Sequence, residues 1–417
     1  MLITPEGVGQ RLRWARESRQ ITQETAGAAL GLQRSAISLM ESGQRQVSTL
    51  ELTHLADLYD RPVEWFVNPT SPIAQEDPVV ALFRAEPGLQ SEVVQKQARR
   101  CLRLLREGSS LRRLTGSRAT VSLPRYELPP PRSVGQAIAQ GQLVAEQERR
   151  RLDLGQAPVK VPETLAYQNI WTAALPLPDE ISGLFLSSSD FGMAILANLT
   201  QAPVRRRFSF AHEHGHVLMD RNEPATVTSA HNAKTRTEQR ANAFATAFLM
   251  PEEGVRDFLY NLGKGRGTRR EEAAVDAVTE EGIQGQLRSP ARSQNVTYAD
   301  VALLAWHFEV SYTAAVWRLR GLNLVSQEQA QTLLDQTEEA NRYLRTVRAF
   351  SDGEDSEDES LAPAKAGEHW DHELDWQILS LALEAWWRGE ISQGRLLEVG
   401  RLLDIDDETI LELADFC

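Results

Sequence analysis

The chain has 417 residues, of which 41% are hydrophobic and 25% charged, and it carries a formal net charge of -13 at pH 7. A chain of this length can bury sizeable cores in about two to four domains, while its acidic balance argues against a protein that binds polyanions over its whole surface. Only two cysteines occur, Cys101 and Cys417, without a C-x-x-C pair, which argues against a disulfide framework and a thiolate zinc site.

The N-terminal residues lack the apolar segment of a signal peptide, and no stretch of the chain approaches about twenty consecutive apolar residues. We therefore expect a cytoplasmic protein that has no membrane partner.

Residues 1–67 are expected to form the first domain, because apolar side chains recur at helical spacing in successive segments between residues 6 and 67. The second segment ends at Gly31, where a turn requires a positive φ. This arrangement predicts a helix-turn-helix domain. Its expected core positions are Leu12, Ala15, Ala26, Leu30, Ile37, Leu50, Leu55, Ala56 and Leu58.

This stretch resembles the Cro/XRE family of repressor-like helix-turn-helix domains. The family signature is met in large part by Thr22, Gln23, Ala26, Gly31, Leu32, Ser35, Ile37, Ser38, Glu41 and Gly43. The resemblance implies that the third helix enters the major groove of double-stranded DNA. The candidate base readers are then Gln33, Arg34, Ser35 and Ser38, with Gln23 and Arg45 near phosphates.

The charge of this domain leaves a second interpretation open. Residues 1–67 contain seven arginines and eight acidic residues, a net charge of -1, whereas a dedicated DNA-binding domain usually has a basic face. The alternative is a protein-docking domain that pairs with a similar repressor.

Residues 68–132 are expected to contain a Pro-rich linker and then a basic helical connector. Residues 91–132 contain ten lysines and arginines but only three glutamates, a net charge of +7, and could follow DNA phosphates. We favour an amphipathic helix that has a solvated basic face and turns its apolar side chains toward a protein surface. These side chains are Val93, Val94, Leu102, Leu104 and Leu105.

Residues 133–260 are expected to form a small α+β domain. A helical pattern covers residues 133–152, and strand-like runs follow at Ile170–Leu175, Gly183–Leu186 and Met193–Asn198. Two further helical stretches complete the domain, so that three short strands precede two helices.

The first of these two helices contains the motif His212-Glu213-His214-Gly215-His216, an H-E-x-x-H pattern. His212 and His216 lie one turn apart, about 6 Å along one helix face, where two imidazoles can bind one ion. Zinc accepts such nitrogen ligands, and Glu213, about 100° round the helix, is placed to act as a general base. A histidine-rich helix with its imidazoles in a polar core is the structural alternative, and His214 is not expected to be a ligand.

The third ligand is expected on the second helix, at Glu238. This carboxylate lies on an apolar helix face, in register with Ala241 and Ala245. A buried unpaired charge costs several kcal/mol, so an arginine partner or a metal must compensate it. His231 and Asp220 are the alternative ligands.

Two segments, RRRFSFAHEHGHVLMD at residues 205–220 and EQRANAFATAFLMPEE at residues 238–253, resemble the ImmA/IrrE family of zinc metallopeptidases. The resemblance implies a gluzincin-like site and a transcriptional repressor as substrate, often one of the helix-turn-helix kind. The implied zinc ligands are His212, His216 and Glu238, with Glu213 as the catalytic carboxylate. The ligand spacing by itself implies only metal-assisted hydrolysis.

The substrate is expected to bind in an extended form along a strand edge beside the metal. Met193–Asn198 is the strand-like run before the metal-binding helix, so Ala197 and Asn198 are the candidate substrate-binding residues. His231 and Tyr298 are the candidates for an oxyanion donor.

Residues 261–296 are rich in Gly, Arg and Ser and are expected to be a mobile insertion. Residues 297–350 are expected to form a helix-turn-helix-like helical segment, and residues 297–324 within it resemble the small helix-turn-helix that follows the peptidase unit in the ImmA/IrrE family. We favour packing of this segment on the peptidase over separate DNA binding.

Residues 351–372 are expected to form an acidic linker and residues 373–417 a helical tail. Three potential metal ligands precede this tail, but a solvated loop is favoured there over a metal site. These residues are His369, Asp371 and His372.

The expected fold is mainly α-helical, with a small α+β zincin-like peptidase domain, an N-terminal five-helix repressor-like domain and a helical C-terminal tail. The expected function is that of a zinc-dependent regulatory endopeptidase that cleaves a helix-turn-helix repressor and has its own DNA-binding domain. One zinc ion per chain is the expected cofactor, with Mn²⁺ as the alternative, and a homodimer is a further expectation. The alternative function is a transcription regulator whose peptidase-like domain senses a metal or a partner without proteolysis.

Overall fold

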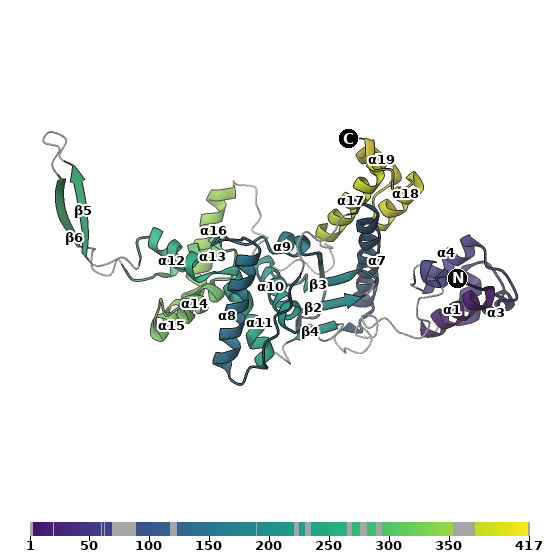
Figure 1. Ribbon diagram of the computed structural model, residues 1–417, viewed down its shortest axis with the longest axis horizontal. Coiled ribbons are helices and arrows are strands. Elements are labelled where there is room, and N and C mark those ends of the chain that lie inside the picture. The colour runs from purple at the N-terminus through teal and green to yellow at the C-terminus, as the bar shows by residue number, and fades with distance from the viewer. Residues whose placement is uncertain are drawn as a thin grey trace. The chain divides into compact units, whose positions relative to one another are not determined.

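The structure is a computed structural model and is shown in Figure 1. It describes residues 3–19, 21–59, 61, 63–68, 89–116, 123–188, 190–220, 225–229, 235–264, 269–275, 282–288, 294–352 and 372–415. The chain divides into two compact units, Met1–Ala81 and Leu82–Cys417, which are described separately. None of the described helices is both long and apolar enough to cross a bilayer.

The described residues of the N-terminal unit form five helices. They are α1 (Pro5–Ser18), α2 (Gln23–Ala29), α3 (Arg34–Glu41), α4 (Thr49–Tyr59) and α5 (Val63–Val67). The side chains of Thr4 and Thr22 cap α1 and α2, because each hydroxyl accepts a hydrogen bond from a backbone N–H of the first turn. Gly31 has a φ of +66° after α2, as the sequence predicted.

The core of this unit contains most of the predicted apolar positions, including Leu12, Ala26, Ile37 and Leu55. Leu50 is the exception, because 76% of its surface is exposed. The buried face of α4 carries Leu52, Leu55, Ala56 and Tyr59, and Leu50 lies outside that spacing.

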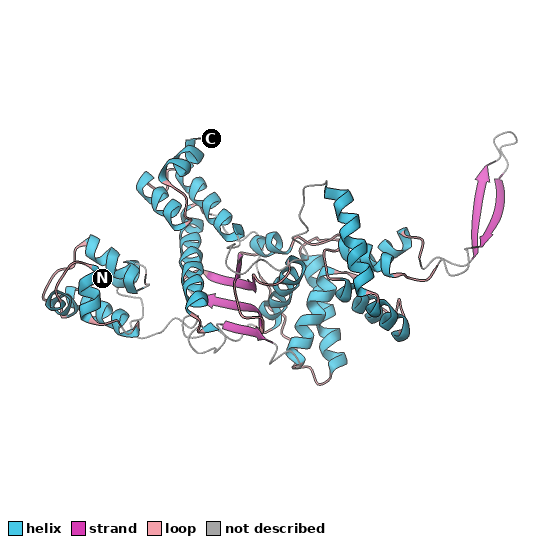
Figure 2. Cartoon of the chain, turned by 180° about the vertical axis from the view of Figure 1, so that it is seen from behind, coloured by secondary structure: helices cyan, strands magenta, loops and turns pink. Residues whose placement is uncertain are grey.

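The second unit is built around a four-stranded sheet, shown in Figure 2. Its strands are β1 (Ile170–Leu175), β2 (Ile181–Ser188), β3 (Gly192–Asn198) and β4 (Ala225–Ser229), in the order β1-β3-β2-β4. β1 is parallel to β3, and the other two pairs are antiparallel. The predicted fold class is therefore confirmed, with β4 as a strand that the sequence did not predict.

The strand order corrects the prediction that substrate binds at Ala197 and Asn198. β3 lies inside the sheet, where Ala197 pairs with Ala174 on one side and with Gly183 on the other. Both Ala197 and Asn198 are fully buried. Their backbone groups therefore face neighbouring strands and not an open edge.

α9 (Val161–Tyr167) packs against β1, and α10 (Pro203–Met219) packs against β2 and β3. α11 (Arg236–Leu249) packs in turn against α10 and α8 (Val134–Arg151), and α12 (Glu252–Asn261) follows α11. They share one hydrophobic core with α13 (Tyr298–His307), α14 (Tyr312–Gly321), α15 (Gln327–Asp335) and α16 (Thr337–Asp352). Arg318 strengthens this packing, because its Nε donates to the Met250 carbonyl at 2.8 Å. The helix-turn-helix-like segment thus packs on the α+β domain.

Gly141 allows α8 to approach α11 closely. A Cβ atom at this position would lie 2.7 Å from the Phe244 backbone nitrogen and even closer to the Arg240 carbonyl oxygen. Since both atoms are backbone, Gly141→Ala should lower the free energy of unfolding of this unit by about 1–3 kcal/mol or more. Gly135→Ala on the same helix is the matched control, because a Cβ there meets nothing closer than 4.0 Å. Denaturant midpoints of the two variants test this, and equal midpoints would contradict it.

The basic connector forms α7 (Glu92–Leu114), which packs against α17 (His372–Trp387) and β1 (Figure 1). Its buried side chains include Val94, Leu102, Leu104 and Leu105, as the amphipathic interpretation predicted. Val93 is the exception, at 64% exposed. The C-terminal region continues with α18 (Gln393–Leu402) and α19 (Asp407–Asp415).

Several cations of α7 are used within the unit, which argues against the DNA-phosphate interpretation. The Arg112 guanidinium lies 3.3 Å from the centre of the Trp171 ring and also donates to Asn169. Arg106 and Arg100 form ion pairs with Asp190 and Asp375, each at 3.4 Å.

Residues 269–275 (β5, Arg269–Val275) and 282–288 (β6, Gly282–Arg288) form a two-stranded antiparallel sheet, where the sequence predicted no regular structure. Most of the acidic linker, with His369 and Asp371, lies outside the described residues, and His372 begins α17.

Candidate metal centre

Two helices, α10 and α11, bring three potential metal ligands together. His212 and His216 lie one turn apart on α10, and Glu238 lies in the first turn of α11. One ligand atom of each lies within 4.8 Å of the others, and all three side chains are buried. The Thr235 hydroxyl caps α11 by accepting the Glu238 backbone N–H at 3.3 Å. This cap fixes the helix start that carries the carboxylate, and a helix N-terminus favours negative charge.

The outer nitrogens of both imidazoles bind acceptors, which orients the rings. His212 Nδ1 donates to Asn242 Oδ1 at 2.9 Å, and His216 Nδ1 donates to Asp220 Oδ2 at 3.1 Å. Asp220 is held in turn by an ion pair with Arg240. Because the Nδ1 atoms donate these hydrogen bonds, both Nε2 atoms face Glu238. Each Nε2 atom can offer its lone pair to a metal ion once it is deprotonated.

The distances among these donor atoms suit one small ion. His212 Nε2 lies 3.0 Å from Glu238 Oε2 and 3.1 Å from His216 Nε2, and His216 Nε2 lies 3.4 Å from Glu238 Oε1. Two atoms that each lie about 2.0–2.1 Å from a tetrahedral zinc ion are about 3.3 Å apart. Two imidazole nitrogens and a carboxylate therefore fit a zinc ion in both donor type and spacing.

The pKa values of His216 and Glu238 show that this cluster favours a positive charge beside a carboxylate. Burial lowers the pKa of His216, but hydrogen bonds to Asp220 and Glu238 outweigh it and raise this pKa to about 10. Burial likewise opposes ionisation of Glu238, yet hydrogen bonds from His212 and His216 lower its pKa to about 2. The ionised Glu238 carboxylate is thus balanced by a positive charge on the imidazoles. A bound metal ion would supply that positive charge instead.

Glu213 lies beside this trio and is fully buried. Neither carboxylate oxygen lies within hydrogen-bond distance of a partner among the described residues, although the Thr228 hydroxyl is near enough to favour the charged form. Burial raises the pKa of Glu213, against the opposing effect of His216, His212 and that hydroxyl. A buried carboxylate with so few partners destabilises the fold, and such groups are usually retained for a function. The position of Glu213 next to the trio is therefore the second observation that fits a metal centre with a general base.

Gly183 of β2 makes room for Glu213. A Cβ atom at this position would lie 2.7 Å from Glu213 Oε1. Gly183→Ala should therefore displace the carboxylate and lower turnover by about 10²-fold, because small misplacements of catalytic groups have effects of this size. Bound metal, measured by elemental analysis, should stay unchanged.

Ser187→Ala on the same strand is the control for Gly183→Ala, since it removes one half-buried hydroxyl and adds no atom. Equal turnover of Gly183→Ala and the wild type would show that the carboxylate tolerates the shift.

The other predicted residues occupy different places. Asp220, an alternative ligand, accepts a hydrogen bond from Nδ1 of His216 and is not among the three clustered ligand residues. His214 is buried against the edges of the stacked Phe244 and Phe248 rings, and burial lowers its pKa to about 4. Tyr298 packs against the hydrophobic core at the start of α13, and His231 lies outside the described residues.

Asn242 and Arg240 were not predicted as parts of this centre. Asn242 follows Glu238 by four residues and so shares its helix face, a spacing that could have identified it. Arg240 on α11 forms an ion pair with Asp220 at the end of α10, and the sequence contains no signal for that contact.

In the N-terminal unit, four of the predicted DNA-contacting side chains are exposed on or just before α3. They are Gln33, Arg34, Ser35 and Ser38. Gln23 is half-buried at the start of α2, and Arg45 is paired with Glu51 at 2.6 Å.

Comparison with family models identifies both units. Residues 8–64 match a helix-turn-helix domain, and residues 165–274 match the peptidase M78 model, described as an IrrE N-terminal-like domain. Comparison with curated proteins finds no match. The predicted resemblances are therefore confirmed: the chain combines an N-terminal helix-turn-helix domain with an IrrE N-terminal-like domain of the metallopeptidase type, as in a regulator that carries a peptidase-family domain.

Proposed function

We propose that this chain is a zinc-dependent regulatory endopeptidase that cleaves a helix-turn-helix transcriptional repressor. The observation that carries this proposal is the cluster of His212, His216 and Glu238 with the unpartnered Glu213 carboxylate beside it. A purely structural polar core would be expected to satisfy that carboxylate with hydrogen bonds.

In this proposal the three clustered residues hold the ion, while Asn242 and Asp220 keep both imidazoles in the correct tautomer. Zinc, when bound, would supply a Lewis acid for the scissile carbonyl and lower the pKa of water. Glu213 would accept the proton of the attacking water and pass it to the leaving amine. Its raised pKa suits this task, because a base is most effective when its pKa approaches the working pH.

The β4 end of the sheet suggests where a substrate would lie, because β4 has only one neighbour among the described strands. β4 is the terminal strand next to β2, and Gly183 of β2 both pairs with Thr228 of β4 and contacts Glu213. At the other end of the sheet, β1 is adjacent to α7, α9 and α17. An extended segment of the repressor could pair with β4 through main-chain hydrogen bonds. That segment would then lie near Glu213.

The proposal is tested by incubating the zinc-loaded protein with the product of the neighbouring regulator gene and analysing the mixture on a gel. We expect a new fragment that is absent with Glu213→Gln. If zinc-loaded protein binds that regulator but yields no fragment, the peptidase-like domain is a sensor of a metal or a partner. Elemental analysis of the purified protein distinguishes zinc from Mn²⁺.

We further propose that the N-terminal domain binds double-stranded DNA through α3. Since phosphate contacts release counterions, affinity should fall with rising salt, with a slope of about -0.9 per neutralised phosphate in a plot of log affinity against log salt. Fluorescence anisotropy with promoter duplexes measures this slope. Removing residues 1–67 should abolish binding, and unchanged binding would assign the contact to another part of the chain.

A further inference from the structure

A segment without helix or strand, residues 123–131, is held against the end of the metal-binding helix α10. This segment, the proline segment, ends in Pro129-Pro130-Pro131. The backbone N–H of Tyr126 donates to the Leu218 carbonyl at 2.9 Å, in the last turn of α10. A helix end leaves such carbonyls without a partner inside the helix. The proline segment therefore supplies a missing hydrogen bond to α10 just before Asp220.

A chain of side-chain hydrogen bonds connects the same segment to the candidate metal ligand His216. Gln140 Nε2 of α8 donates to the Pro129 carbonyl at 2.9 Å, and Gln140 Oε1 accepts from Arg240 Nη1 at 3.2 Å. Arg240 Nη2 donates to Asp220 Oδ1, and Asp220 Oδ2 accepts from His216 Nδ1 at 3.1 Å. Three side chains, the Gln140–Arg240–Asp220 relay, thus link the proline segment to His216.

The two ends of the Gln140 amide cannot be exchanged. A guanidinium has only donors, and the Pro129 carbonyl can only accept, so Oε1 must face Arg240 and Nε2 must face Pro129. Gln140 is 8% exposed and Arg240 is 4% exposed. Because water has little access to these groups, the loss of either contact would leave a buried polar group unpaired, which is unfavourable. The position of Arg240 therefore depends on the position of the proline segment.

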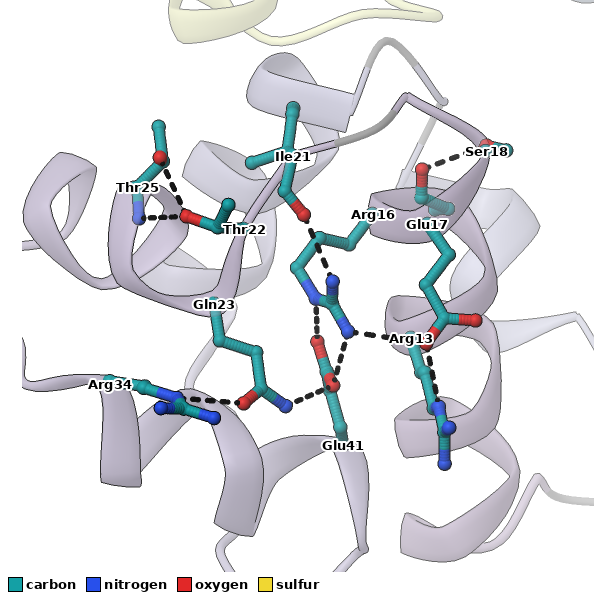
Figure 3. A network of polar contacts seen from close by, with 11 residues as sticks. Arg13, Arg16, Glu17, Ser18, Ile21, Thr22, Gln23, Thr25, Arg34 and Glu41 are labelled. Atoms are coloured by element: carbon teal, nitrogen blue, oxygen red, sulfur yellow. Dashed lines mark hydrogen bonds and ion pairs between the residues drawn. The ribbon is translucent and has the colours of Figure 1, made fainter.

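A second bridging glutamine provides a comparison. In the N-terminal unit, Gln23 donates to Glu41 at 2.8 Å and accepts from Arg34 at 3.5 Å (Figure 3). The bond between Gln23 and Arg34 is exposed to solvent, whereas the bond between Gln140 and Arg240 is buried. Water can replace a lost partner at Gln23, so only the bridge at Gln140 makes its two ends depend on each other.

Asp220 depends on Arg240 because of its place on α10. It is the C-cap residue of this helix, and the helix macrodipole disfavours a carboxylate at a helix C-terminus. The Arg240 guanidinium supplies the compensating positive charge. If Arg240 turned away, Asp220 could leave His216 Nδ1 for solvent, since 19% of its side-chain surface is exposed.

We infer that the proline segment regulates the metal affinity of this centre, with Gln140 and Arg240 as positioning residues that act through Asp220 on His216. While the segment is held, the relay keeps the imidazole with its Nε2 toward the metal position. When the segment is displaced, the imidazole loses that constraint. The inference rests on the proposed metal centre, but it does not require the cleavage of any substrate.

The test uses the full chain after removal of metal with a chelator, and zinc itself as the probe. Gln140→Met removes both hydrogen bonds without changing the charge. It should weaken zinc binding by about 3- to 10-fold, less than the roughly 10- to 100-fold typical of a residue that contacts a metal ligand directly. Competition with a zinc-binding dye measures the dissociation constant.

Gln136→Met is the matched control on the same helix. Gln136 lies one turn before Gln140, and its Oε1 accepts from the Arg132 backbone N–H at 2.7 Å, outside the relay. The variant loses a similar amide from α8 but keeps the contact between Gln140 and Arg240. It should therefore keep the dissociation constant of the wild type for zinc.

Hydrogen exchange supplies a readout that a loss of stability alone would not change. Linkage is reciprocal, so the factor by which the held segment strengthens zinc binding is also the factor by which zinc stabilises the held segment. In the wild type, zinc should slow exchange of the Tyr126 backbone N–H by about 3- to 10-fold. In Gln140→Met, zinc should leave that exchange rate unchanged.

Gln140→Glu separates the two ends of the bridge. The carboxylate keeps an acceptor for Arg240, but it cannot donate to the Pro129 carbonyl. This variant should bind zinc at least as tightly as the wild type. It should nevertheless lose the zinc-dependent protection of the Tyr126 N–H, because the proline segment is no longer connected to the relay.

Three results would overturn the inference. The first is an exchange rate of the Tyr126 N–H in the wild type that zinc does not change. The second is a folded Gln140→Met protein with wild-type zinc affinity, and the third is an equal loss in Gln136→Met, which would indicate a general effect of α8. If the wild type binds no zinc, the proposed metal centre fails, and this inference fails with it. Zinc binding with all the expected changes, but no fragment from the regulator, would support the inference and refute only the proposed proteolysis.

Discussion

Replacing Glu213 with glutamine is expected to lower turnover by about 10²–10⁴-fold, the usual contribution of a positioned general base. The amide has nearly the same shape as the carboxylate but cannot accept the proton of water. The three clustered ligand residues are unchanged, so stoichiometric metal should remain. The measurement is fragment formation per unit time, together with elemental analysis of the same preparation.

The structure makes this variant informative, because neither oxygen of Glu213 lies within hydrogen-bond distance of a partner among the described residues, and the nearby Thr228 hydroxyl can also interact with an amide oxygen. Its stability should therefore equal or exceed that of the wild type, since removing a buried unpaired charge removes a desolvation penalty. A Glu213→Gln protein that purifies without metal would instead identify Glu213 as a ligand. Unchanged turnover would assign the base to another group.

The second large effect is expected for Glu238→Ala, which should sharply reduce metal occupancy. The change leaves two imidazoles, and a catalytic zinc site usually needs three protein ligands. Zinc at about 100 times its dissociation constant stabilises a folded protein by about 2.7 kcal/mol. Wild-type protein should gain about this much unfolding free energy when zinc is added after chelation, and Glu238→Ala should gain little.

Glu252→Ala is the control for Glu238→Ala, because it also removes a carboxylate, but one that is exposed and paired with Arg256. It should keep both its metal and the stabilisation by zinc. Normal occupancy in Glu238→Ala would move the third ligand to His231 or to Asp220, which caps the end of α10.

Helices and the two histidines of the candidate metal centre could be predicted because their signals are local, whereas Glu238 was proposed from its place on an apolar helix face. Helical periodicity, Gly31 and the H-E-x-x-H spacing each involve residues within one or two turns of each other. Three of the four sheet strands followed from short apolar runs. β4 was missed because its sequence, ATVTS, has only five residues and contains no run of consecutive apolar side chains such as those that marked the other three strands.

Features that depend on pairing between distant segments could not be predicted. Nothing in Met193–Asn198 indicates that β1 will pair on one side and β2 on the other, so the expected open edge at Ala197 was wrong. The space that Gly183 leaves for Glu213 and the contact between Arg240 and Asp220 depend on the same long-range geometry.

The packing of α7 against α17 has a consequence for synthesis on the ribosome. Gly108 leaves space for Ile378, Glu107 pairs with Arg395, and the Thr115 carbonyl accepts from Arg388. These partners are separated by more than 250 residues in the sequence. The part of α7 that packs on α17 can therefore be covered only after almost the whole chain has been translated. At about 5–20 residues per second, that interval lasts on the order of 10–60 seconds. Nascent chains stalled before α17 should therefore keep the α7 face accessible to chaperones, and release of the finished chain should end that exposure.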